Sequence, residues 1–106
     1  MTSTNANPLT GASAGNIAIG DNALTAITGA ATSNVAIGYN ALTKSTVNST
    51  NPNTGVGFDA MEYATSGTNN TALGNNAMLG ASASPLTGDY NVALGDSALY
   101  LSLIHI

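Results

Sequence analysis

A nine-residue pattern recurs five times along this chain of 106 residues. It consists of Asn, any residue, Ala or Gly, a large aliphatic residue, Gly, any residue, a polar residue, Ala, and then Leu or Met. The five copies, called motifs 1 to 5 below, occupy residues 16–24, 34–42, 53–61, 70–78 and 91–99, and they begin 18, 19, 17 and 21 residues apart. Recurrence at this period is typical of solenoids, in which each repeat is too small to bury a core alone and stacks on its neighbours.

The residues before the Gly of each motif alternate between small and large side chains, as expected for a β-strand. Because the third position is always Ala or Gly, another stretch of backbone is predicted to pass close to it. The fourth position always holds a large aliphatic residue, which is predicted to reach a hydrophobic interior on the opposite face of the strand. These residues are Ile19, Ile37, Val56, Leu73 and Leu94.

The Gly at the fifth position permits a bend or a positive φ after the strand. These turn glycines are Gly20, Gly38, Gly57, Gly74 and Gly95. A second short strand is expected to follow, and its last residues complete the expected repeat core: Leu24, Leu42, Met61, Met78 and Leu99. The leading Asn suits a turn that opens the first strand, and its side chain is expected to stack in register from repeat to repeat.

The predicted fold is therefore all-β, a parallel β-roll or β-solenoid of about five coils with about ten short strands, two in each motif. No helix longer than a single turn is expected, because Gly, Thr and Asn are frequent and no helical stripe of apolar residues can be drawn. Residues 1–15 are predicted to be an irregular lead-in, residues 16–100 the solenoid, and residues 101–106 a separate tail. Loops of variable length between the motifs are expected to leave one face of the solenoid.

Large apolar side chains are scarce, since Leu, Ile, Val and Phe together make up only about a fifth of the chain. This fraction is near the level at which composition begins to indicate disorder. Disordered chains usually also have a high net charge, whereas only 6% of the residues here are charged. About three large apolar side chains in each coil offset little of the backbone entropy lost on folding, about 1–2 kcal/mol for each ordered residue. Identical chains that share their aliphatic ridges would bury a second face, so we expect the chain to form an oligomer.

The charged residues exclude several classes of partner. Lys44 is the only Lys or Arg, and the formal net charge is −4. No basic surface is therefore available to bind the phosphates of a nucleic acid or anionic lipid head groups. No apolar run approaches the roughly 20 residues of a membrane-spanning helix, so this segment is not expected to insert into a membrane.

Three stretches of the chain resemble the head repeat of trimeric autotransporter adhesins. They are Gly15 to Gly20, Asn34 to Gly38 and Asn91 to Gly95. The stretch from Gly67 to Gly74 is also similar to repeats in bacteriophage tail-fibre proteins. The resemblance implies a left-handed parallel β-roll, a homotrimer wound about one axis, and attachment to host or cell-surface receptors from a bacterial surface or a virion tail fibre. The repeats here are longer than the compact adhesin unit, and motif 3 has Gly55 where Ala is expected.

No catalytic, metal or cofactor site is predicted, and the chain is not expected to be an enzyme. Cleavage of a glycan would need two carboxylates roughly 5–9.5 Å apart. Asp21 and Asp96 hold equivalent places in motifs 1 and 5, which puts them about 19 Å apart at the usual strand spacing. Asp59 and Glu62 are expected on opposite faces of a strand because their offset is odd. Metal ligands are scarce, since the chain has no Cys and a single His.

The aromatic residues allow two interpretations. Tyr39 and Phe58 hold equivalent turn positions in neighbouring motifs, which predicts a structural aromatic stack. A ligand-stacking surface is the alternative, formed by Tyr39, Phe58, Tyr63, Tyr90 and Tyr100. A monomeric solenoid that binds glycan or ice is also considered, because Thr is plentiful, although no register of Thr recurs in all five motifs.

The last six residues, Leu101 to Ile106, break sharply with the composition of the repeats and contain the only His. They also match the translation of a transposase-adapter sequence used in shotgun library preparation. We therefore interpret residues 101–106 as an adapter-derived tail and assign no chemical role to His105. A genuine hydrophobic final strand is the alternative interpretation.

Overall fold

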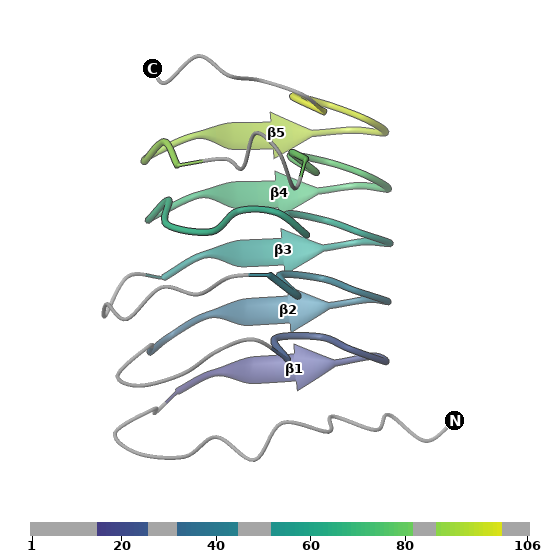
Figure 1. Cartoon of the computed structure of the whole chain (residues 1–106), viewed down its shortest axis with the longest axis vertical. Helices are drawn as coiled ribbons and strands as arrows, with labels where there is room; N and C mark the ends of the chain where they lie inside the picture. The colour runs from purple at the N-terminus through teal and green to yellow at the C-terminus, as the bar shows by residue number, and fades with distance from the viewer. Residues whose placement is uncertain (1–14, 26–31, 45–51, 82–86, 101–106) are drawn as a thin grey trace.

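The computed structural model of this chain describes residues 15–25, 32–44, 52–81 and 87–100. Each motif contributes one strand of three residues, and Figure 1 shows the five strands stacked in one sheet and pointing the same way. The strands are β1 (Ile17–Ile19), β2 (Val35–Ile37), β3 (Thr54–Val56), β4 (Thr71–Leu73) and β5 (Val92–Leu94). They are parallel and follow one another in chain order across the sheet. The predicted all-β solenoid is confirmed, and the described residues contain no helix.

The register of the sheet aligns the motifs position by position. Val35 pairs with Thr54, Ala36 with Gly55, and Ile37 with Val56. The neighbouring pairs of strands keep the same correspondence. Equivalent residues of the five motifs therefore form straight columns up the stack.

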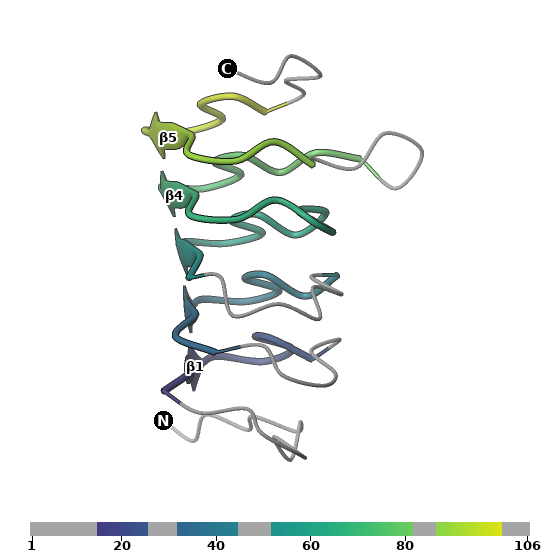
Figure 2. The same cartoon turned by 90° about the vertical axis from the view of Figure 1, so that its left-hand side faces the viewer.

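The expectation of a second strand in each motif is wrong. After the turn glycine, each motif continues as a turn, and the turns of neighbouring motifs stack on one another. Figure 2 shows the strands along one side of the stack and the turns on the other. The seventh and ninth positions both have positive φ, as in Asn40 (55°) and Leu42 (55°). Hydrogen bonds still join the turns, since the Leu42 N–H donates to the Ala60 carbonyl at 3.0 Å. Two left-handed residues in every turn prevent the extended geometry of a strand.

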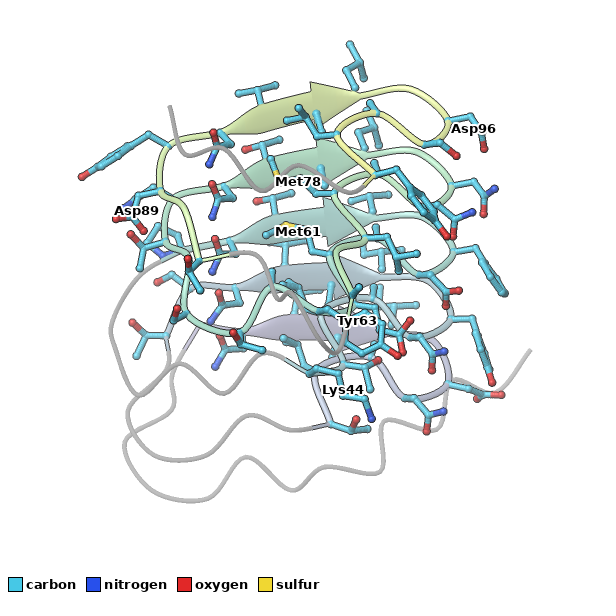
Figure 3. The ribbon with its side chains drawn as sticks, turned by 45° about the horizontal axis from the view of Figure 1, so that its top comes forward. Lys44, Met61, Tyr63, Met78, Asp89 and Asp96 are labelled. Carbon is cyan, nitrogen blue, oxygen red and sulfur yellow. The ribbon has the colours of Figure 1, made fainter. Side chains whose placement is uncertain are left out.

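These left-handed residues place the largest side chains inside the solenoid. Asn and Asp adopt positive φ readily, but Leu and Met do so at a cost of roughly 1–2 kcal/mol. Full burial offsets this cost, because it stabilises a Leu or Met side chain by roughly 1.5–3 kcal/mol. The ninth-position residues are almost fully buried in motifs 1 to 4, with exposed fractions of 1%, 0%, 0% and 3% for Leu24, Leu42, Met61 and Met78. Figure 3 labels Met61 and Met78 in the middle of the stack, at the level of the strands.

Small third-position residues face these side chains from the sheet. Ala36 and Ala72 are fully buried, and Ala93 is 2% exposed. A Cβ atom added to Gly55 would lie 3.2 Å from the Ala60 carbonyl oxygen and 3.4 Å from Cγ of Leu42. The predicted close passage of backbone is confirmed, and the space between sheet and turn admits only small residues on the strand.

The leading Asn residues form the ladder that the sequence predicts. The Asn53 N–H donates to Oδ1 of Asn34 at 2.9 Å, and the Asn70 N–H donates to Oδ1 of Asn53 at 2.9 Å. The Nδ2 of Asn53 donates to the Gly67 carbonyl at 2.9 Å. Asn34, Asn53 and Asn70 are at most 3% exposed. Because each side chain has its partners, the ladder carries buried polar groups up the stack without the cost of unsatisfied hydrogen bonds.

Replacing Ala72 with Leu is expected to destabilise the chain by about 1–3 kcal/mol, the usual cost of overpacking. The reason is the narrow space between β4 and the adjacent turn, in which Ala72 is already fully buried. Thermal melting of Ala72→Leu measures the loss. Thr71→Leu is the matched control, because Thr71 precedes Ala72 and its side chain is exposed. Equal losses in the two variants would contradict the assignment of Ala72 to the narrow interior.

Candidate functional site: the exposed aliphatic face

The second and fourth positions of every motif point away from the solenoid interior and form two columns on the outer face of the sheet. This follows from strand alternation, because the third position between them points inward. One column consists of Ile17, Val35, Thr54, Thr71 and Val92, and the other of Ile19, Ile37, Val56, Leu73 and Leu94. We call these ten residues the aliphatic face. None of them is charged, and eight are Ile, Val or Leu.

Much of the aliphatic face is open to solvent. The exposed fraction is 49% for Ile17 and 50% for Ile19 at one end, and 71% for Val92 and 72% for Leu94 at the other. Leu73 is 47% exposed. Parallel sheets normally have both faces covered, and contiguous exposed apolar surface usually marks an interaction site. The aliphatic face is therefore the strongest candidate site in the part of the chain that the structure describes.

The fourth-position residues do not fill the interior of the solenoid, and the expectation that they do is wrong. The distance between strand and turn accommodates Ala or Gly from the strand together with Leu or Met from the turn. A large aliphatic residue of the strand must therefore lie on the outer side. The ninth-position residues do form the core, except that Leu99 is 40% exposed.

A corner column follows the turn glycines along one side of the sheet. It consists of Asp21, Tyr39, Phe58, Asn75 and Asp96. The rings of Tyr39 and Phe58 stack with centroids 5.3 Å apart and an angle of 15° between their planes, which confirms the predicted aromatic pair. Higher in the column, Nδ2 of Asn75 donates to Oδ1 of Asp96 at 2.8 Å. Both rings remain about half exposed, so the pair adds apolar surface beside the aliphatic face.

Tyr90 lies apart from this aromatic pair. It precedes β5, whereas Tyr39 and Phe58 follow β2 and β3, so the two groups flank opposite sides of the sheet. In Figure 3 the neighbours Asp89 and Asp96 likewise lie on opposite sides of the stack. Tyr90 is 77% exposed and has a φ of 59°. Tyr90 and the Tyr39–Phe58 pair therefore do not form one ligand-stacking surface.

Asp59 and Glu62 are not on opposite faces of a strand, contrary to expectation. Residues 58–63 form a turn, to which the two-residue period of a strand does not apply. The Glu62 N–H donates to the Asp59 carbonyl at 3.3 Å. Partial burial, and then the charge of Asp59, raise the pKa of Glu62 above its ordinary value, while Lys44 and a hydrogen bond with Tyr63 act in the opposite direction. The negative charge of Glu62 in turn raises the pKa of Tyr63.

The raised pKa of Glu62 predicts a small loss of stability with increasing pH. A carboxyl group whose pKa is higher in the folded state stabilises the fold at low pH, and this contribution is lost as pH rises through the folded pKa. Glu62→Gln is therefore expected to melt above the parent at pH 7, by only about 1–3 °C, because the group is only partly buried and solvent screens its charge. The difference should disappear below pH 4.5, the ordinary pKa. If the two proteins differ in melting midpoint by the same amount at both pH values, the change in side-chain shape, and not the loss of charge, causes the difference.

Other kinds of site find no support among the described residues. They contain no group of three His, Cys, Asp or Glu side chains placed to hold a metal ion. A search of the same residues for a long apolar helix that could cross a membrane found none. Comparisons with protein-family models, curated proteins and solved structures gave no match to this chain.

Strand alternation alone could have placed the second and fourth positions on one face. The direction in which that face points, away from the solenoid interior, did not follow from the alternation. The third position of the motif, which is always Ala or Gly, could have indicated this direction. Only such small strand residues fit an interior as narrow as the one observed.

Proposed function

We propose that this chain is a structural and adhesive segment of a homotrimeric surface or tail fibre that attaches to cell surfaces or host receptors. The observation that supports this proposal is the aliphatic face, an uncharged and largely apolar surface that runs the length of the sheet. The solenoid core does not use this surface. Identical chains that pack these faces together would cover it.

The dimensions of the aliphatic face suit contact between rigid, parallel rods. Five strands at the usual spacing give a column about 19 Å high, and straight columns repeat at every step of the stack. Two equivalent columns on each chain can interdigitate with those of a neighbour without any change of register. Burial of about 25 cal/mol for each Å² of apolar surface would supply stability that the narrow core does not.

The remaining parts of the proposal rest on the resemblance of the motifs to adhesin heads and phage tail fibres. They are the left-handed winding, five coils, the three-fold axis, and a location on the bacterial surface, outside the cell or on a virion. The partners proposed are two further copies of the chain and a receptor on a host or cell surface. We propose no catalytic role, cofactor, nucleic-acid partner or membrane insertion for this segment.

Solution mass together with thermal melting tests the assembly. A trimer held by the aliphatic face is expected to sediment at three times the chain mass of 10.4 kDa. Its melting midpoint should rise with protein concentration over a hundred-fold range, because dissociation accompanies unfolding. A well-folded monomer whose midpoint does not depend on concentration would refute the trimer.

A monomeric binding solenoid is the second candidate, and Thr54 and Thr71 favour it. These two residues are paired in register on the open face of β3 and β4. An exposed, flat array of Thr and aliphatic side chains would suit ice, and the polar turns beside it would suit a glycan. A monomeric mass together with thermal hysteresis in freezing solutions, or with binding on a glycan array, would favour this candidate.

A further inference from the structure

The corner column contains two aromatic rings that the fold itself does not require. The other three motifs have Asp21, Asn75 and Asp96 at the same position and keep the same strand and turn. Tyr39 and Phe58 are 47% and 51% exposed, although their motifs have a stacked motif both above and below them. Their exposure is therefore a property of the middle of the stack, and burial in the fold accounts for only half of each side chain.

The two rings present flat apolar surface because they are offset from one another. Their planes are nearly parallel, at 15°, and their centroids lie 5.3 Å apart. This distance exceeds the ~3.5–4.0 Å at which carbon atoms pack in contact, so neither ring lies directly over the other. Each ring leaves part of a face uncovered by its neighbour. We call the surface of Tyr39 and Phe58 the aromatic ledge.

Backbone hydrogen bonds hold the aromatic ledge in place. The Asp59 N–H donates to the Tyr39 carbonyl at 2.9 Å, and the Asn76 N–H donates to the Phe58 carbonyl at 2.8 Å. Each ring is thus attached to a backbone that is bonded to the next motif. A binding surface on such a rigid frame loses little conformational entropy when a ligand binds.

Hydrogen-bonding side chains follow the aromatic ledge at both ends of the corner column. Asp21 lies one motif before Tyr39, and Asn75 lies one motif after Phe58. Nδ2 of Asn75 donates to Oδ1 of Asp96 at 2.8 Å, and a carboxamide has a second N–H hydrogen and an acceptor oxygen besides. Figure 3 shows Asp96 at the outer rim of the stack, pointing away from it. The column therefore combines an apolar centre with polar ends that accept and donate hydrogen bonds.

We propose that the corner column is a binding site for a neutral oligosaccharide. This proposal rests on the proposed function and names the class of receptor that the segment attaches to. The C–H faces of a pyranose pack on aromatic rings, and its hydroxyl groups form hydrogen bonds with carboxylates and carboxamides. The site lies after the turn glycines and is separate from the aliphatic face.

The charge of the corner column disfavours other classes of ligand. Asp21 and Asp96 would repel the carboxylates of an acidic sugar. A cationic side chain has no acceptor for the N–H groups of Asn75, because Lys and Arg only donate hydrogen bonds. A sugar hydroxyl both donates and accepts, so a neutral glycan matches all the polar groups of the column.

The spacing of the corner column favours an extended chain of sugars. Five equivalent positions at the usual strand spacing span about 19 Å. The 5.3 Å between the ring centroids is close to the length that one pyranose adds to an extended β-1,4-linked chain. Successive sugars can therefore meet successive motifs, with the aromatic ledge under the middle of the chain and the polar groups toward its ends.

Cellohexaose, a neutral β-1,4-linked hexasaccharide, is the probe, titrated into the full chain and followed by NMR of ring and amide protons. Saturable shifts are expected at Tyr39, Phe58 and Asn75. Tyr39→Ala and Phe58→Ala are each expected to weaken binding about tenfold, through the loss of one aromatic contact. Tyr39→Phe keeps the ring and should bind as the parent does. Tyr90→Ala is the matched control, because it removes an exposed Tyr outside the corner column.

A second probe keeps the test decisive if either alanine variant does not fold. It is cellohexaose oxidised to carboxylates at C6, which has the same linkage and added negative charge. This probe should bind the unaltered chain at least about tenfold more weakly than cellohexaose, because like charges repel. Equal binding of the two probes, no saturable shifts with cellohexaose, or shifts only outside the corner column would overturn the proposal.

Sedimentation of the same samples separates this proposal from the proposed assembly. A trimer that does not bind cellohexaose would refute the oligosaccharide site alone. A monomer that binds cellohexaose at the corner column would refute the trimer alone.

Discussion

Ile37→Asp is expected to abolish the proposed trimer and leave a chain that sediments as a monomer. Ile37 lies in the middle of the aliphatic face, with Ile19 and Val56 as its neighbours in register. In a three-fold assembly the substitution would bring three carboxylates into a dry interface. An uncompensated buried charge typically costs about 3–5 kcal/mol, and three of them would exceed what the interface supplies. Sedimentation and melting at several concentrations measure the effect.

The matched control for Ile37→Asp is Ser66→Asp. Ser66 is exposed and lies outside the sheet, so the same charge is added away from the aliphatic face. This variant is expected to keep the mass of the proposed trimer and an unchanged melting midpoint. If Ile37→Asp also keeps its mass, the aliphatic face is not the contact between subunits. In that case the monomeric binding solenoid becomes the better proposal.

Gly57→Ala is expected to prevent stable folding or to lower the melting midpoint by at least about 15 °C. A Cβ atom at this position would lie 2.3 Å from the carbonyl oxygen of Gly74, and φ is 140°, where L-residues are strained. Backbone strain costs roughly 1–3 kcal/mol, and the clash adds overpacking of similar size. Together they approach the total stability of a small domain, about 5–15 kcal/mol. Circular dichroism melting measures the loss.

Gly95→Ala separates these two causes. Gly95 has a comparable φ of 119°, but an added Cβ would meet nothing within 4 Å. This variant is therefore expected to show only the strain, with a smaller decrease in midpoint. If Gly57→Ala and Gly95→Ala lower the melting midpoint equally, the close stacking of Gly57 on Gly74 contributes nothing to the loss of stability.

The sequence by itself determined the repeat, the position of each strand and the register of the sheet. These features depend on local patterns that recur in every motif. Strand alternation located β1 to β5, and the recurring Gly marked the bend that follows each strand. The Asn ladder and the Tyr39–Phe58 stack also followed, because equivalent residues of stacked repeats must lie above one another.

Only the tertiary structure decided which face of each strand points inward. Alternation separates Ala36 from Ile37 but does not say which of them lies inside. The answer depends on the distance to the opposing turn, which is set by left-handed residues such as Leu42 and Met61. Nothing in a Leu or Met side chain signals positive φ, so the expected second strand and the separation of Asp59 from Glu62 were both wrong. Those conformations are favourable only because stacking buries the side chains, and stacking is a property of the folded chain.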